Sequence, residues 1–194
     1  MSAAEFLPLV SVEQYLADEL VREVRHEYLG GRVYAMAGGT NTHNRVAANF
    51  VGAMFGRLRG SGCGAFGSDV KVRIPRRTHT RFYYPDGTVV CDSNGPGDTF
   101  QDRPVVVLEV LSPSTRRLDE GEKLEAYLDL SSVRVVLLAE PDRVEVTAYR
   151  RSERTGGVDP ERYLSIGDTV PLPEVEAELQ LADLYDGVDL RAAS

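Results

Sequence analysis

The stretch VVVLEVL, residues 105–111, decides the fold, because every position in it is apolar except Glu109. A continuous apolar run of this length is typical of a central strand that is buried on both faces of a sheet. An unpaired carboxylate is costly to bury in such a strand. Glu109 must therefore be protonated, hydrogen-bonded, paired with a cation or bound to a metal ion, which makes it the first candidate functional residue.

A second acid, Asp86, lies upstream in the sequence YYPDGTVV, residues 83–90. If its strand neighbours the strand of Glu109, both acids can point at one site between the two strands. Two carboxylates placed in this way can hold Mg²⁺ or Mn²⁺ and leave other positions to water and phosphate oxygens. The segment Pro85-Asp86-Gly87 is also an ordinary turn sequence, so Asp86 is a weak signal by itself.

Lys123 is the third candidate, on a helix that residues 119–130 predict downstream of the Glu109 strand. If this helix returns across the sheet, the ammonium group could stabilise an attacking hydroxide or the charge of a phosphorane-like transition state. The chain has 20 arginines but only two lysines, Lys71 and Lys123, and an ammonium can be tuned where a guanidinium stays protonated. The alternative is a solvated ion pair between Lys123 and Asp119, four residues earlier.

Three further residues, together with Asp119, could belong to the same site. Glu27 would complete an acid cluster, or it would pair with an arginine across its own hairpin. His43, in the first turn of a predicted helix, would cap or pack that helix, or face a phosphate. Asp69 would be either a supporting acid of the site or simply an acid at the start of a strand.

Hydrophobic periodicity and turn residues predict the remaining elements. A capping box, with Ser11 as N-cap and Gln14 reaching back, begins the first helix. Helices are predicted at 12–20, 42–59, 119–130 and 179–184, a hairpin at 25–36, two strands within 65–91 joined by a basic connection at 75–80, strands at 105–111, 133–139 and 144–149, and loops at 92–103 and 151–162.

The composition, with 194 residues of which 42% are hydrophobic and 27% charged, is that of one globular domain. We expect a mixed α/β domain over residues 1–194, with a core at about 10–185 and peripheral tails at 1–9 and 188–194. No apolar run approaches the ~20 residues that cross a bilayer, and no basic cluster of a secretory signal begins the chain. We therefore expect a cytoplasmic protein without a membrane partner, in which Cys63 and Cys91 are two buried thiols.

The formal net charge of −8 argues against a protein that coats nucleic acid in bulk. It leaves room for an enzyme that gathers carboxylates around a metal ion and binds a polyanion through one local basic patch. The densest such patch is the connection carrying Arg76, Arg77 and Arg81. These arginines, with Arg116 close to the proposed site, are the predicted nucleic-acid contacts, although a solvated hairpin tip is the alternative.

Asp86 and the downstream Glu109 together resemble the PD-(D/E)XK nuclease superfamily, which has the restriction-endonuclease-like fold. The third position of that motif is Leu111, where the superfamily usually has lysine. The layout from about 10 to 185 is similar to the bacterial Uma-two family of endonucleases. The matching positions are Glu27 to Gly31, Ala35 to Gly39, His43, Ser68-Asp69, Tyr84 to Asp86, Glu109 to Thr115, Asp119, Lys123 and Tyr127.

The resemblance implies a metal-dependent phosphodiesterase that acts on DNA, with Lys123 replacing the motif lysine from the following helix. Asp86, Glu109 and the Val110 carbonyl would hold Mg²⁺ or Mn²⁺, with Glu27 further out. We expect the fold to combine a mixed central sheet, flanking helices, and an N-terminal helix with a β-hairpin. A symmetric homodimer would be the simplest way to meet both strands of a duplex. The alternatives are an inactive nuclease-like module that binds nucleic acid or protein, and hydrolysis of another phosphoester.

Overall fold

The computed structural model describes residues 9–152 and 157–190, so most of the predicted tails at 1–9 and 188–194 lies outside the described residues. A six-stranded sheet with the order β11-β10-β9-β8-β6-β3 forms the centre. Its strands span Val158–Tyr163 (β11), Val146–Arg151 (β10), Val135–Ala139 (β9), Pro104–Val110 (β8), Gly87–Val90 (β6) and Gly64–Gly67 (β3). Strand β8 runs parallel to β9 and antiparallel to β6, which confirms the predicted mixed sheet and the adjacent strands of the two acids.

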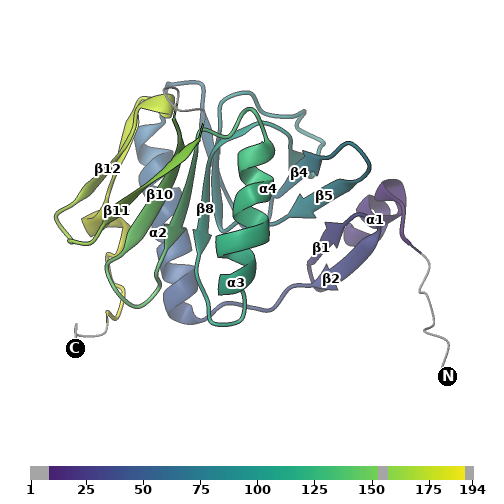
Figure 1. The fold of residues 1–194 in the computed structure, drawn as a ribbon, viewed down its shortest axis with the longest axis horizontal. Helices are drawn as coiled ribbons and strands as arrows, with labels where there is room; N and C mark the ends of the chain where they lie inside the picture. Colours follow the sequence, from purple (N-terminus) through teal and green to yellow (C-terminus); the bar gives the residue numbers. More distant parts are fainter. Residues whose placement is uncertain (1–8, 153–156, 191–194) are drawn as a thin grey trace.

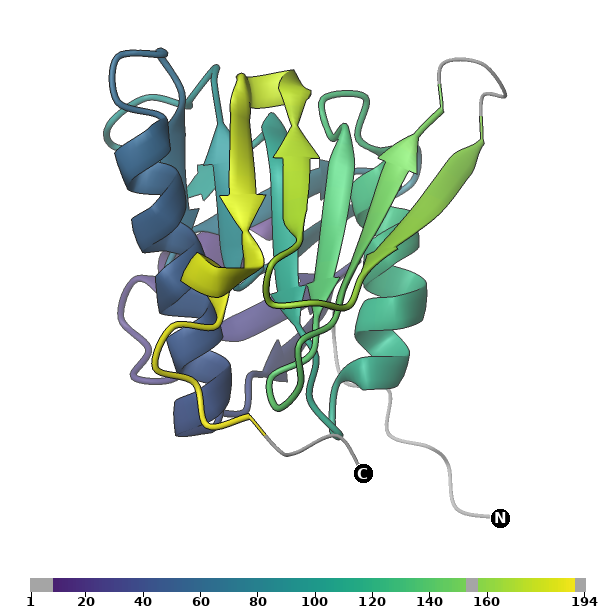
Figure 2. The same cartoon turned by 90° about the vertical axis from the view of Figure 1, so that its left-hand side faces the viewer.

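Helices cover both faces of this sheet, as Figures 1 and 2 show. The long helix α2, Asn41–Arg57, lies on one face and packs Phe50 against the β8 residues Val106 and Leu108. The helix built from α3 (Arg116–Leu118), a π-helical turn (Asp119–Lys123) and α4 (Leu124–Asp129) lies on the other. Alternate β8 side chains serve the two faces, so Val107 packs with α4, and Glu109 points to the same side.

A smaller sheet with the order β2-β1-β5-β4-β7 carries the N-terminal part of the chain. Its strands are Arg32–Ala35 (β2), His26–Leu29 (β1), Thr80–Tyr83 (β5), Lys71–Pro75 (β4) and Phe100–Gln101 (β7). Helix α1, Val12–Glu19, packs its buried Tyr15 against this sheet. Ser11 caps the helix as predicted, but the Gln14 side chain donates to Asp18 instead of reaching back.

The predicted strand around Asp86 divides at residues 84–86, between β5 of the small sheet and β6 of the central sheet. The predictions of a turn and of strands were therefore both correct. The turn lies at residues 84–86, and a strand lies on each side of it. Gly87 is required here, because a Cβ atom at that position would lie 2.5 Å from the Phe50 ring. The break lets the chain pass from one sheet to the other and leaves Asp86 at the junction.

Several local predictions were wrong. The predicted loop 151–162 contains most of β11, which pairs with β10, and the loop 92–103 contains β7. Only Leu181–Leu184 (α5) of the predicted closing helix is helical; Ala177–Gln180 (β13) pairs with Thr169–Leu172 (β12) in a two-stranded sheet beside α2.

Cys63 and Cys91 form a disulfide, and Cys91 is exposed, so the predicted pair of buried thiols was wrong. The cause is the register of β3 and β6: Gly64 pairs with Val90, which places the two flanking cysteines opposite each other. Among the described residues, no helix is long and apolar enough to cross a membrane.

Candidate active site

A cavity of about 390 Å³ lies at the carboxyl end of β8, and both predicted acids line it. Asp86 and Glu109 meet there because Gly87 of β6 pairs with Leu108 of β8. Glu109 is buried, with 3% of its surface exposed. The sheet register alone therefore brings together two carboxylates that are 23 positions apart in the chain.

Asp86 is held in place by two groups from different elements. The Val110 backbone N–H donates to Asp86 Oδ2 at 2.7 Å, and His43 Nε2 lies 3.2 Å from the same oxygen. Thr40 caps α2 by accepting from the His43 backbone N–H, which fixes His43 in the first turn. Burial lowers the pKa of His43, but the hydrogen bond and negative charge of Asp86, with a contribution from the Val110 backbone, raise it above its ordinary value overall.

Lys123 reaches three carboxylates from the far face of the same strand end. Its Nζ lies 2.8 Å from Glu27 Oε1, 3.4 Å from Glu109 Oε1 and 3.5 Å from Asp119 Oδ1. Burial alone would lower the pKa of Lys123, but these carboxylates raise it above the ordinary value, so the ammonium stays charged. The solvated pair with Asp119 is excluded, because both side chains are buried.

Glu109 has a proton affinity that is unusual for a glutamate. Burial raises its pKa well above the ordinary value; the charge of Lys123 opposes this, and the charges of Asp86 and Asp119 add to it. Tyr127 donates a hydrogen bond to Glu109 Oε1 at 2.7 Å. Burial also raises the pKa of Asp119, against the opposing charge of Lys123. The acids thus crowd one buried place, and a bound cation would relieve their repulsion.

The donor set fits a hard divalent cation. Within residues 9–152 and 157–190, no group of three or more His, Cys, Asp or Glu side chains is arranged to hold a metal ion by itself. Mg²⁺ in phosphoryl-transfer sites is usually held by one or two carboxylates, and water and substrate phosphates complete its shell. Asp86 and Glu109 supply that number of carboxylates, and Asp86 Oδ1 and Glu109 Oε2 take part in none of the contacts given above.

Two loops, which the family resemblance matched in large part without assigning them a role, form most of the cavity wall. Residues 36–40 precede α2, and residues 111–115 follow β8. Gly39 is needed in the first loop, since a Cβ atom there would lie 2.7 Å from His43 Nδ1. The second loop is held by its own hydroxyls: Ser112 Oγ lies 2.7 Å from Thr115 Oγ1. Both loops bring backbone and hydroxyl groups to the acids.

The remaining predicted residues fall in different places. Glu27, His43 and Asp119 belong to the site by their contacts. Asp69 lies on the surface, pairs with Arg25 and does not line the cavity, so the structure leaves it out.

The predicted basic patch does not gather at the cavity. Arg76 pairs with Asp129 at the far end of α4, roughly 20 Å along the helix from Arg116 at 1.5 Å per residue. Arg81 pairs with Glu122 and Arg116 with Glu140, while Arg77 is exposed. Their predicted contact with nucleic acid stays a prediction.

Tyr127 is the site residue that the pattern of apolar positions concealed. Its position on the inner face of the helix predicted packing, and the structure adds a hydrogen bond to Glu109. Tyr84 lines the cavity as well, and its hydroxyl contacts Lys71 at 3.2 Å and Glu19 at 3.0 Å. Lys71, the other lysine of the chain, thus supports the segment that carries Asp86 and lies outside the acid cluster.

A mixed sheet with paired acids at one strand end, and a lysine delivered by the next helix, defines a protein of the restriction-endonuclease-like class. A crystal structure described as a "putative nuclease belonging to DUF820" from Anabaena variabilis shares this fold, with a TM-score of 0.69 and 18% identity, covering 91% of this chain and 98% of that chain. The family model Uma2, described as "Putative restriction endonuclease", matches residues 12–184. The chain belongs to the Uma2 family.

Two relatives from Synechocystis sp. are similar over most of their length. The uncharacterized protein slr1290 is 34% identical over 148 residues, which cover 75% of this chain and 76% of that protein. The uncharacterized protein sll1609 is 23% identical over 146 residues, covering 74% and 81%. The resemblance that the motifs predicted is confirmed at the level of family and fold.

Proposed function

We propose that this protein is a Mg²⁺- or Mn²⁺-dependent endonuclease that hydrolyses phosphodiester bonds of DNA. Asp86 and Glu109, with the Val110 carbonyl, would hold the ion. When bound, the ion would polarise a phosphoryl oxygen and activate the attacking water. Membership of a family described as restriction endonucleases supports the nuclease reaction.

Lys123 supplies a fixed positive charge to the same place. Its ammonium, held by Glu27 and Asp119, would stabilise the charge that builds up on the phosphate in the transition state. Glu27 acts as an orienting acid: it accepts the shortest contact from Lys123, at 2.8 Å. His43 would hold Asp86 until substrate and ion are bound.

The observation that carries the proposal is the contact of Lys123 Nζ with Glu109 Oε1 at 3.4 Å. Leu111 occupies the usual lysine position of the motif, and a motif without lysine could mean an inactive site. In the fold, the helix after β8 brings a buried ammonium to the acid of the motif. The lysine has thus changed its place in the sequence and kept its place beside the carboxylate.

Asp86→Asn tests the proposal, because it keeps the size and the hydrogen-bond acceptor but removes the charge. Calorimetric titration with Mg²⁺ and Mn²⁺ should show binding to the wild type and its loss in the variant. Nicking of supercoiled plasmid in the same samples should fall by about 10²–10³-fold or more. Asp69→Asn is the matched control: this acid lies outside the cavity, and both readouts should stay at the wild-type level.

The outcomes separate the proposed enzyme from the alternatives. DNA binding without cleavage by the wild type, with any metal ion, would establish an inactive binding module. Metal binding without DNA cleavage, but with hydrolysis of a small phosphodiester, would point to another phosphoester as substrate. Absence of metal binding would overturn the proposal. Light scattering of the complex with DNA would show whether the expected homodimer forms.

A further inference from the structure

Glu140 is a buried carboxylate that the proposed reaction does not use. It follows the last residue of β9, and because β9 runs parallel to β8, it lies at the same edge of the sheet as Glu109. Only 5% of its side chain is exposed. A charge buried to this extent must be paired, so the identity of its partners shows what it does.

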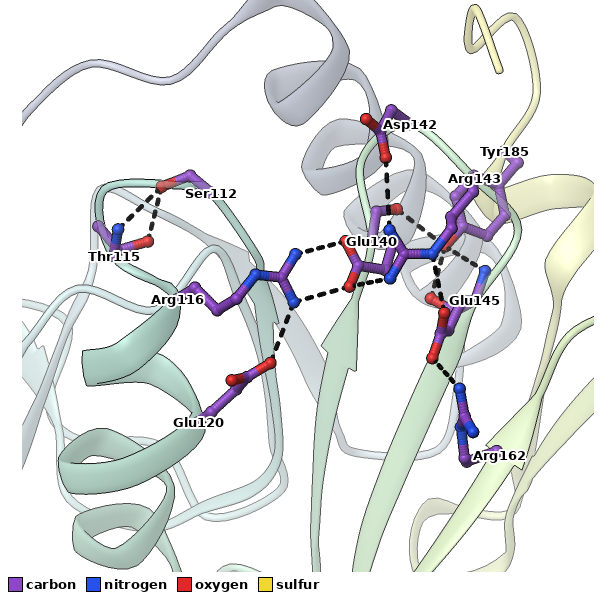
Figure 3. A network of polar contacts seen from close by, with 10 residues as sticks. All are labelled: Ser112, Thr115, Arg116, Glu120, Glu140, Asp142, Arg143, Glu145, Arg162 and Tyr185. Atoms are coloured by element: carbon purple, nitrogen blue, oxygen red, sulfur yellow. Dashed lines mark hydrogen bonds and ion pairs between the residues drawn. The ribbon is translucent and has the colours of Figure 1, made fainter. Parts of the chain in front are cut away.

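Two arginines pair with Glu140, as Figure 3 shows. Arg116 Nη1 and Nη2 donate to the two carboxylate oxygens at 2.8 and 2.7 Å, and Arg143 Nη2 donates at 2.5 Å. The fork of the Arg116 guanidinium fixes orientation as well as distance. Its remaining contact in Figure 3 is to Glu120 at 3.0 Å, so this guanidinium is already occupied by carboxylates.

The pair joins two segments that line the cavity of the candidate active site. Arg116 directly follows the Ser112–Thr115 segment, and its backbone N–H donates to the Ser112 carbonyl at 2.8 Å. Pro141 and Asp142 directly follow Glu140. Both segments line the cavity. The Tyr185 hydroxyl donates a hydrogen bond to the Glu140 carbonyl at 3.0 Å and so fixes the backbone there.

We propose that Glu140 is a positioning residue, which acts through Arg116 to hold the Ser112–Thr115 segment against Pro141 and Asp142. The inference rests on the proposed nuclease function, because the wall formed by Ser112–Thr115, Pro141 and Asp142 faces the place where the substrate phosphate would lie. It also gives Arg116 a different role from the one the sequence predicted. Arg116 orients the wall from behind and leaves the phosphate to Lys123 and the bound ion.

Glu140→Gln and Arg116→Gln distinguish the two roles, because positioning predicts parallel losses of kcat in the two variants, whereas direct phosphate binding predicts KM shifts of opposite sign. If the pair positions the wall, both variants lower kcat by about 10- to 100-fold and leave the KM for DNA within about twofold. If Arg116 binds phosphate directly, Arg116→Gln raises KM, whereas Glu140→Gln frees the guanidinium and lowers KM. Arg116→Lys keeps the charge but loses the fork, so positioning predicts the same fall in kcat.

Hydrogen exchange gives a readout that does not depend on cleavage. The backbone N–H groups of residues 115, 116, 118 and 119 donate within this wall and the first helical turn. Glu140→Gln should speed their exchange at least about threefold, with thermal unfolding used to confirm that the variant folds. Arg162→Gln is the control, since Arg162 belongs to the same network through Glu145 but lies on β11, and exchange at the wall should not change.

Unchanged exchange at the wall in Glu140→Gln would overturn the inference, as would opposite KM shifts in the two variants. A wild type that binds DNA but never cleaves it would overturn the proposed function alone, and the exchange data would still decide whether Glu140 holds the wall. Parallel losses of kcat with faster exchange would support both.

Discussion

Two networks of ion pairs lie side by side at the carboxyl ends of β8 and β9, and they differ in charge balance. Around Lys123, one ammonium faces Glu27, Glu109 and Asp119, with Asp86 close enough to raise the pKa of Glu109. Around Glu140, three arginines face four carboxylates, so the charges nearly balance. That network comprises Arg116, Arg143 and Arg162 with Glu120, Glu140, Asp142 and Glu145.

The difference teaches how to separate a scaffold from a site. A nearly balanced network satisfies most of its own charges, and its exposed pairs add little to stability. An acid-rich buried cluster leaves negative charge uncompensated, which is costly unless a cation arrives. The second arrangement is relieved by a bound cation or by protonation of an acid, and for that reason it is the better candidate for catalysis.

Lys123→Met gives the largest expected effect on stability. It removes the ammonium that contacts the three carboxylates, and loss of one partner of a buried ion pair costs about 3–5 kcal/mol. Lys123 lowers the pKa of Glu109 and Asp119, so their pKa values rise further in the variant. Carboxyls whose pKa is raised in the folded state reduce the stability of the protein as pH rises. The loss of stability caused by the substitution, measured by urea unfolding, should therefore be smaller at low pH. A loss of stability below about 1 kcal/mol at neutral pH would contradict the proposed difference between the two networks.

Tyr127→Phe should cost less, since it removes one hydrogen bond to Glu109 and keeps the ring. A hydrogen bond to a charged group contributes about 1.5–3 kcal/mol. Tyr163→Phe is a matched control, because its hydroxyl donates to the exposed Glu161 at 2.7 Å, and its loss should be under about 0.5 kcal/mol. Equal losses in urea denaturation would mean that burial of Glu109 does not strengthen its contacts.

Glu109→Gln tests the excess of negative charge through pH. Burial raises the folded-state pKa of Glu109 above 4.5, so its stabilising contribution is present below 4.5 and is lost as pH rises through the raised pKa. Glutamine cannot ionise. The Tm of the variant minus that of the wild type should therefore increase by about 2–4 °C from pH 5 to pH 8, the shift that 1 kcal/mol produces in a domain of this size. A difference independent of pH would contradict a raised pKa for the buried Glu109.

Arg162→Gln should have the smallest effect on stability, and it tests the nearly balanced network around Glu140. Its side chain is 59% exposed and pairs with Glu145, which Arg143 also contacts at 2.9 Å. The expected loss is under about 0.5 kcal/mol. A loss above about 2 kcal/mol in the same urea experiment would mean that the outer network stabilises the fold as a unit.

The central sheet could be predicted because its information is local. The run around Glu109 has the composition of a doubly buried strand, and the spacing of Val46, Phe50 and Met54 specifies the packed face of α2. The neighbouring of the two acid-bearing segments was a conditional hypothesis, because an acid in an apolar strand requires a partner, and the sheet order itself came only from the structure. Strand β11 has no such pattern, since most of its residues are exposed, and only its pairing with β10 makes it a strand.

The site could be predicted as a set of residues but not as a set of contacts. Asp86, Glu109 and Lys123 carry charges where apolar or helical patterns make charge conspicuous. Arg76, Arg81 and Arg116 each pair with an acid 24 to 53 positions away, and nothing in the local sequence marks these distant partners. The cavity walls at 36–40 and 111–115 depend on how these two loops fold. The residue types in the loops do not specify that conformation.

The π-helical turn from Asp119 to Lys123 sets the angular phase of the whole helix. Such a turn holds one residue more than an α-helical turn and commonly marks a functional position. If all of these residues formed a regular α-helix instead, the part of the helix after the turn would rotate by about 100° relative to the part before it. Asp119 and Tyr127 could then no longer face Glu109 together. The π-helical turn therefore absorbs one residue, and this allows the helix to present an acid, a lysine and a tyrosine to one carboxylate.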